Sequence, residues 1–193
     1  MLYWLLVPLK DHWIFFNVFR YITVRTVLAG ITALLISMIA GPLLIKYLRK
    51  RQIGAEIRIE GPKTHYTKKG TPSMGGILII GATIITTLIW GDLGNEYVWL
   101  AIITMLSFGL VGFWDDYIQS KKKIKQGLVA RHKIIFQTIL ATVIGLILIY
   151  LGSRGEFNLH LSVPFFKNWT PYFGAFYLPW IMFILVGSSN SVN

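Results

Sequence analysis

Two adjacent carboxylates, Asp115 and Asp116, are the residues of this sequence best suited to chemistry. They follow an apolar run from Tyr97 to Trp114 that is long enough to cross a bilayer. Neighbouring carboxylates repel each other, and the negative end of a helix dipole disfavours each charge by roughly 0.3–1 kcal/mol. A divalent cation would offset that cost, so the pair predicts a metal site where a helix leaves the membrane. Two solvated acids that mark a helix end are the alternative.

A second candidate site lies in a basic segment upstream. Thr71 followed by Pro72 is a good N-cap and first-turn pair, so a helix is predicted to begin there. The free N–H groups and positive dipole of that helix start, beside Lys68 and Lys69, predict a site for phosphate-like anions. An ordinary basic loop ahead of a capped helix fits the charges equally well.

Small and polar residues occur close to two predicted helix ends. Gly75 and Gly76 each cost about 1 kcal/mol against alanine inside a helix, which indicates a close approach of backbone or ligand. The segment Gly187–Asn193 is rich in Ser and Asn, as membrane helices are where they touch. Alternatively, Asn190 and Asn193 line a polar ligand or metal site.

The composition is that of an integral membrane protein. Of the 193 residues, 54% are hydrophobic and only 14% are charged, against about 25% in soluble proteins. The net charge of +11 could indicate a nucleic-acid partner, but basic cytoplasmic loops explain it better, so we expect none. The absence of cysteine excludes disulfides, thiol chemistry and cysteine-bound zinc.

Five hydrophobic spans must position the candidate residues, which predicts an all-α polytopic membrane protein with one membrane domain over residues 1–193. The aromatic-rich residues 1–21 are predicted to lie along the membrane surface. Alternating apolar residues from Phe157 to Val163 predict a short strand, and with it an external β-hairpin after the fourth span. The predicted spans are Ile22–Leu48, Met74–Trp90, Tyr97–Trp114, His132–Leu151 and Ala175–Gly187.

The distribution of basic residues predicts the orientation of these spans. Fourteen of the 19 Lys and Arg residues lie close to two connections, between spans one and two and between spans three and four. The positive-inside rule therefore predicts that these connections are cytoplasmic and that the N-terminus is outside. All the candidate chemistry then lies on the cytoplasmic face, where it would suit a diphosphate substrate and a lipid-borne acceptor.

Three separated stretches, Gly61–Gly76, Phe113–Tyr117 and Ser189–Asn193, resemble motifs of the bacterial phospho-N-acetylmuramoyl-pentapeptide transferase family in order and spacing. The last resembles the start of the family's Asn-Leu-Thr-Asp-Gly-Leu-Asp-Gly motif, and the resemblance covers essentially the whole chain. It implies an enzyme of the bacterial cytoplasmic (inner) membrane that transfers phospho-MurNAc-pentapeptide from UDP-MurNAc-pentapeptide to undecaprenyl phosphate. The products would be lipid I and UMP, and the cofactor would be Mg²⁺.

The resemblance also implies roles for individual residues. Asp115 and Asp116 would be the catalytic and metal-binding carboxylates, and Asp115 would deprotonate or orient the lipid phosphate. Lys68 and Lys133 would hold phosphates, and Asn193 would lie near the nucleotide or metal. The whole set implied for substrate and phosphate binding is Lys68, Lys69, Thr71, Ser73, Gly75, Gly76, Lys133, Asn190 and Asn193.

Other interpretations stay open at this point. A related transferase would use UDP-GlcNAc with the same lipid, although the stretch Lys68–Gly76 argues against it. Half of a transporter and a non-catalytic membrane fragment are further alternatives, and a homodimer is left open. Family members have roughly twice as many spans, and their next aspartates would follow Asn193. We therefore expect this chain to be inactive alone, with the main metal ligand in the other half.

Overall fold

The computed structural model describes residues 2–50, 74–121, 128–163, 165–166 and 168–191. Its regular elements are helices, and they fall into two compact units, residues 1–128 and 129–193. Each unit is described by itself, and the expected single membrane domain stays a prediction.

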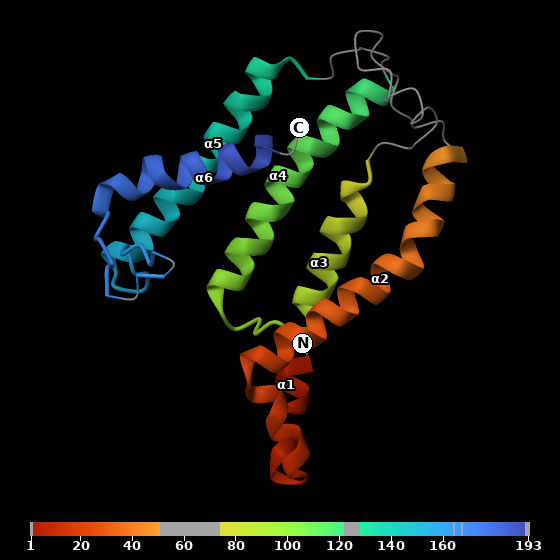
Figure 1. Ribbon diagram of the computed structural model, residues 1–193, viewed down its shortest axis with the longest axis vertical. Coiled ribbons are helices and arrows are strands. Elements are labelled where there is room, and N and C mark those ends of the chain that lie inside the picture. The colour runs from red at the N-terminus through yellow and green to blue at the C-terminus, as the bar shows by residue number, and fades with distance from the viewer. Residues whose placement is uncertain (1, 51–73, 122–127, 164, 167, 192–193) are drawn as a thin grey trace. The chain divides into compact units, whose positions relative to one another are not determined.

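The first unit is built around three long helices, α2 (Ile22–Lys50), α3 (Gly76–Trp90) and α4 (Glu96–Lys121). Helix α3 lies between the other two (Figure 1). Small residues permit this packing: a Cβ on Gly41 of α2 would stand 3.4 Å from the Leu78 side chain of α3. At the far end of α3, the Trp90 indole donates a hydrogen bond to Thr32 Oγ1 of α2 over 3.0 Å.

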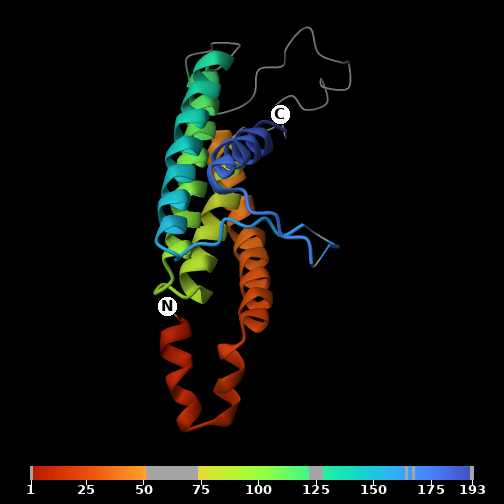
Figure 2. The ribbon, with the colours of Figure 1, turned by 90° about the vertical axis from the view of Figure 1, so that its left-hand side faces the viewer.

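Three short helical pieces precede α2 and double back on themselves (Figure 2). They are α1 (Leu2–Leu6), η1 (Pro8–Asp11) and η2 (Ile14–Arg20). Aromatic contacts join them to the end of α3, since the Phe19 and Trp90 rings stack with centroids 6.2 Å apart. The predicted position of this segment along the membrane surface stays a prediction.

The second unit contains α5 (Ala130–Ser153), the short η4 (Gly174–Phe176) and α6 (Tyr177–Ser191), which packs across α5 (Figure 1). One stripe of α5 is buried, and its members recur at helical spacing. Gly145 belongs to this stripe. A Cβ on Gly145 would stand 2.6 Å from the Leu178 side chain of α6, so only glycine permits so close an approach of the two helices. The buried residues of α5 are Gln137, Ala141, Ile144, Gly145 and Leu148.

The helices follow the predicted spans closely, but the number of spans does not follow from them. Helices α2, α4 and α5 are long and apolar enough to cross a membrane. Helices α3 and α6 have 15 residues each, about 22 Å of helix, against a hydrocarbon core about 30 Å thick. The predicted five spans and their orientation therefore stay predictions.

The predicted external hairpin is reduced to one isolated antiparallel bridge, His160 to Tyr172, in the part of the chain that the structure describes. Two backbone bonds flank the bridge, from Leu161 N–H to the Pro171 carbonyl (3.0 Å) and from Phe173 N–H to the Leu159 carbonyl (3.1 Å). Beyond these contacts the described residues show no further pairing, so the apolar alternation does not form a pair of strands here.

Candidate functional site

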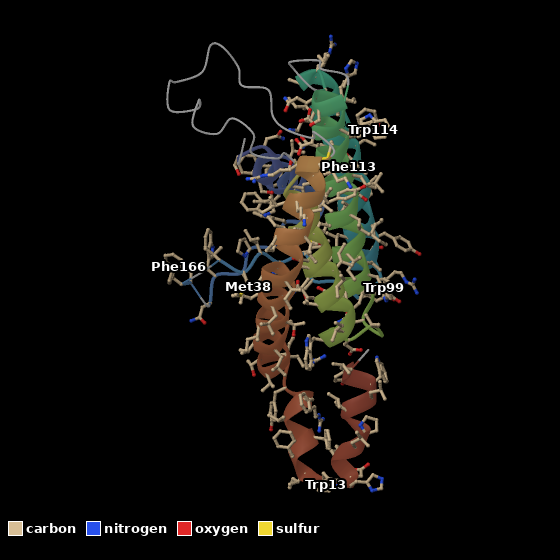
Figure 3. The ribbon with its side chains drawn as sticks, turned by 90° about the vertical axis from the view of Figure 1, so that its right-hand side faces the viewer. Trp13, Met38, Trp99, Phe113, Trp114 and Phe166 are labelled. Atoms are coloured by element: carbon tan, nitrogen blue, oxygen red, sulfur yellow. The ribbon has the colours of Figure 1, made fainter. Side chains whose placement is uncertain are left out.

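The two carboxylates lie inside a helix, which corrects the prediction that they mark its end. Helix α4 continues past Asp115 and Asp116 to Lys121, since Tyr117 and Ile118 keep the segment helical and partly apolar. Aromatic residues on α4 still bracket the apolar run, with Trp99 near its start and Phe113 and Trp114 directly before the acids (Figure 3). Such belts are typical of membrane–water boundaries, and the position of the pair beside one boundary stays a prediction.

Asp116 joins α4 to the start of α3. Its Oδ2 accepts a hydrogen bond from the backbone N–H of Met74 over 3.0 Å, although the two residues are 42 positions apart. Met74 is buried and has a φ of 72°, an unusual conformation for a residue with a side chain. A carboxylate at the positive end of α3 is favourable for the helix dipole. Asp116 therefore holds the peptide at which the basic segment 51–73 ends.

Asp115 makes the corresponding contact to the second basic connection. Its Oδ1 accepts a hydrogen bond from the backbone N–H of Leu128 over 2.9 Å. Leu128 directly follows residues 122–127, whose sequence includes Lys122, Lys123 and Lys125. Residues i and i+1 of a helix do not face the same direction, so the two neighbouring acids reach two different segments. The pair thus gathers the ends of both predicted cytoplasmic connections in one place.

Helix α3 begins later than predicted. Its first residue is Gly76 and its N-cap is Gly75, because the positive φ of Met74 interrupts any helix that would run on from Thr71 and Pro72. Apart from the adjacent residues and the helix's own backbone, no described residue comes within 4 Å of a Cβ built on Gly75 or Gly76. The glycines were predicted to permit a close approach of either backbone or ligand. Close backbone packing is not found among the described residues, and the approach of a ligand stays a prediction.

A cavity of about 280 Å³ adjoins this helix start, between α2 and α3. Its wall includes Gly75, Leu48 of α2 and Leu78 of α3, and among the described residues that line it Arg49 is charged. The described part of its wall is therefore largely apolar with an arginine at its edge.

The carboxylates fit a magnesium ion only as part of its ligand set. Mg²⁺ commonly takes one or two carboxylates and completes its shell with water and substrate phosphates. Within the described residues there is no cluster of three or more His, Asp or Glu side chains that could hold a metal. Carboxylate oxygens are ligands that Mg²⁺ accepts, so Asp115 and Asp116 are chemically suited to a share of its shell.

In the second unit, Asn190 of α6 meets a residue that the sequence did not single out. Its side-chain amide donates a hydrogen bond to Gln137 Oε1 over 2.6 Å, and Gln137 is only 3% exposed. Lys133 precedes Gln137 by one helical turn and so lies on the same face of α5. The isolated glutamine in the apolar run His132–Leu151 was the signal that could have revealed this pair.

The remaining predicted site residues lie outside the described residues. These are Lys68, Lys69, Thr71, Ser73 and Asn193. Their roles stay predictions.

Removing one partner of the Gln137–Asn190 pair should destabilise the second unit more than removing both. Asn190→Leu leaves a buried amide oxygen without its donor, which costs about 1–3 kcal/mol in unfolding free energy, whereas Gln137→Leu combined with Asn190→Leu should come close to the wild-type value. Denaturant unfolding of the three proteins in matched detergent measures the difference. Equal destabilisation by the single and double changes would contradict the pairing.

Two family models match parts of the chain, and curated relatives match all of it. Residues 98–193 match the model described as glycosyl transferase family 4, and residues 68–80 match phospho-N-acetylmuramoyl-pentapeptide-transferase signature 1. Curated proteins named phospho-N-acetylmuramoyl-pentapeptide-transferase, from Thermodesulfovibrio yellowstonii and Desulfatibacillum aliphaticivorans, are 45% and 47% identical over all of this chain. A third, from Desulfosudis oleivorans, is 47% identical. The chain spans 53% of the length of each of these relatives.

Proposed function

Because the chain belongs to the glycosyl transferase family 4 and matches phospho-N-acetylmuramoyl-pentapeptide-transferases over its whole length, we propose that it forms half of such an enzyme. The proposed reaction transfers phospho-MurNAc-pentapeptide from UDP-MurNAc-pentapeptide to undecaprenyl phosphate. The match of residues 68–80 to the transferase signature favours this donor over UDP-GlcNAc.

The reaction exchanges one phosphoanhydride bond for another. A phosphate oxygen of undecaprenyl phosphate bonds to the sugar-bearing phosphorus of the donor, and the bond from that phosphorus to the UMP oxygen breaks. UMP leaves with the electron pair, and the product is a lipid diphosphate, lipid I. Asp115 is the residue that we propose to orient the attacking phosphate, or to take its proton if it arrives protonated.

Other residues bind and position the two substrates. Lys68 and Lys133 contribute positive charge for phosphates in this proposal, and Asn193 contributes an amide. The Asn190 N–H₂ group instead donates to Gln137 Oε1 and to the Val186 carbonyl, so Asn190 supports the site through α5. The apolar cavity beside Gly75, with Arg49 next to it, is suited to the lipid acceptor. When bound, Mg²⁺ would neutralise diphosphate charge and stabilise the leaving UMP, with Asp115 or Asp116 among its ligands. The proposed location of the site is the cytoplasmic face of the bacterial inner membrane.

A single observation carries the proposal from the structure. Adjacent carboxylates on α4 accept hydrogen bonds from Met74, which lies within the signature match, and from Leu128. Met74 and Leu128 directly follow the two basic stretches in the sequence, and cations close to a carboxylate pair are the combination that binds phosphates and a metal together.

The donor preference tests this function. The chain is co-expressed with the C-terminal half of the Thermodesulfovibrio yellowstonii relative, so that a complete protein is assembled in membranes. With Mg²⁺ and undecaprenyl phosphate, UMP release should be clear from UDP-MurNAc-pentapeptide and at background from UDP-GlcNAc. Release from UDP-GlcNAc alone would assign the chain to the other transferase, and lipid-independent release would exclude both.

A further inference from the structure

A second cavity, of about 310 Å³, lies at the opposite end of α3 from the Asp pair, within the first unit. The start of α2, the last residues of α3 and the connection to α4 form its wall. The proposed transferase site does not use it. Its polar lining includes Arg25, Asp92 and Asn95, so it carries one charge of each sign.

Arg25 is half-buried beside this cavity and has one donor atom that no described group satisfies. Its Nε atom is shielded from solvent and has no hydrogen-bond partner within the part of the chain that the structure describes. The guanidinium lies over the Tyr3 ring, 4.3 Å from the ring centroid. This cation–π contact does not supply an oxygen acceptor for the Nε–H group. A shielded N–H donor without an acceptor is costly, and the planar guanidinium pairs well with a phosphate.

The other polar groups of the cavity are held in position by the connection between α3 and α4. Asp92 Oδ1 accepts a hydrogen bond from Gly94 N–H over 3.1 Å, and Asn95 Oδ1 accepts one from Tyr97 N–H over 2.9 Å. The second oxygen of Asp92 can accept hydrogen bonds from a ligand, and the N–H₂ group of Asn95 can donate them. The threonines of the lining instead donate to carbonyls of their own helices.

Aromatic side chains surround this end of the unit. Trp90 is the last residue of α3 and lines the cavity, and Trp99, which is 44% exposed, is fixed by a bond from its indole to the Leu93 carbonyl over 2.9 Å. Trp and Tyr concentrate at the depth of lipid headgroups. The cavity therefore lies where a headgroup, and not an acyl chain or bulk solvent, is the nearest source of ligands.

From these groups we infer that the cavity binds the zwitterionic headgroup of a phospholipid, of the phosphoethanolamine type. The phosphate is held by Arg25 with the Asn95 amide, and the ammonium is held by Asp92. Asp92 decides between headgroups: its charge opposes a purely anionic lipid and favours one that also carries a cation. This lipid site is separate from the acceptor site of the proposed reaction.

Native mass spectrometry of the purified full chain tests the inference. The protein is exposed to equal amounts of phosphatidylethanolamine and phosphatidylglycerol, and retained lipids are counted. We expect phosphatidylethanolamine to be retained preferentially. Arg25→Gln should lower its retention roughly tenfold, the effect of losing a charge-assisted hydrogen bond. Asp92→Asn should lower the ratio of the two lipids by up to about fivefold.

Arg20→Gln is the matched control, because Arg20 is an exposed arginine close in sequence that does not line the cavity. This variant should retain as much phosphatidylethanolamine as the wild type. If Arg25→Gln does not fold, the headgroup ratio of Asp92→Asn carries the test. Equal retention by wild type and Arg25→Gln, or an unchanged ratio in Asp92→Asn, would overturn the inference. A parallel arm adds excess inorganic phosphate: full displacement of the lipid would assign the cavity to free phosphate instead.

Discussion

Asp115→Asn should lower kcat by roughly 10²-fold or more in the chain completed with the C-terminal half of a relative, the range for losing a positioned acid–base group. Asparagine keeps the size of aspartate and retains an oxygen that can accept the Leu128 N–H bond. The change therefore removes charge and leaves the local anchor in place. The loss should appear in kcat more than in KM for the nucleotide, because the interaction is made mainly in the transition state. UMP release under saturating lipid measures it.

Asp116 provides the internal comparison. Asp116→Asn keeps an oxygen that can accept the Met74 N–H bond. Asp116→Leu removes that acceptor and leaves the N–H of the buried Met74 without it. If Asp116 acts through its charge, both changes should lower kcat by roughly 10²-fold or more. If it only anchors the start of α3, Asp116→Asn should be nearly as active as wild type, and Asp116→Leu should be destabilised by about 1–3 kcal/mol.

Tyr117→Phe is a suitable control for these variants, since it changes the next residue of α4 without altering charge and should leave turnover nearly unchanged. Near-normal kcat in both Asn variants would return Asp115 and Asp116 to the role of structural anchors. A common loss of activity and thermal stability in all variants would likewise remove the catalytic assignment.

The sequence predicted the helices well because each one follows from a long apolar run. The predicted span Ile22–Leu48 became α2 (Ile22–Lys50), and His132–Leu151 became α5 (Ala130–Ser153). Hydropathy could not give the helix ends near the site. The end of α4 depends on residues after the acids that are only partly apolar, and the start of α3 depends on the backbone conformation of Met74.

The contacts of the candidate site could be predicted only in part. Chemistry and resemblance singled out Asp115 and Asp116, but not the residues that they hold. The Asp116–Met74 bond joins residues 42 positions apart, and no local pattern encodes such a pairing. The Gln137–Asn190 bond spans 53 positions and arises where α6 packs across α5. Polar residues inside apolar runs indicate that a partner exists, whereas packing decides which residue it is.

The 193-residue chain alone should release no UMP above background. It spans 53% of the length of its relatives, and the described residues hold no third His, Asp or Glu that could join Asp115 and Asp116 at a metal. Phosphoryl transfer depends almost entirely on positioning and on charge stabilisation, so a partial ligand set should leave the diphosphate unactivated. The chain is purified in lipid and given UDP-MurNAc-pentapeptide, undecaprenyl phosphate and Mg²⁺, and the same chain with the added C-terminal half is the positive control. UMP release only by the completed protein is the expected result. Turnover by the chain alone would mean that residues 1–193 already contain every indispensable group, and the division of the site between two halves would then be wrong.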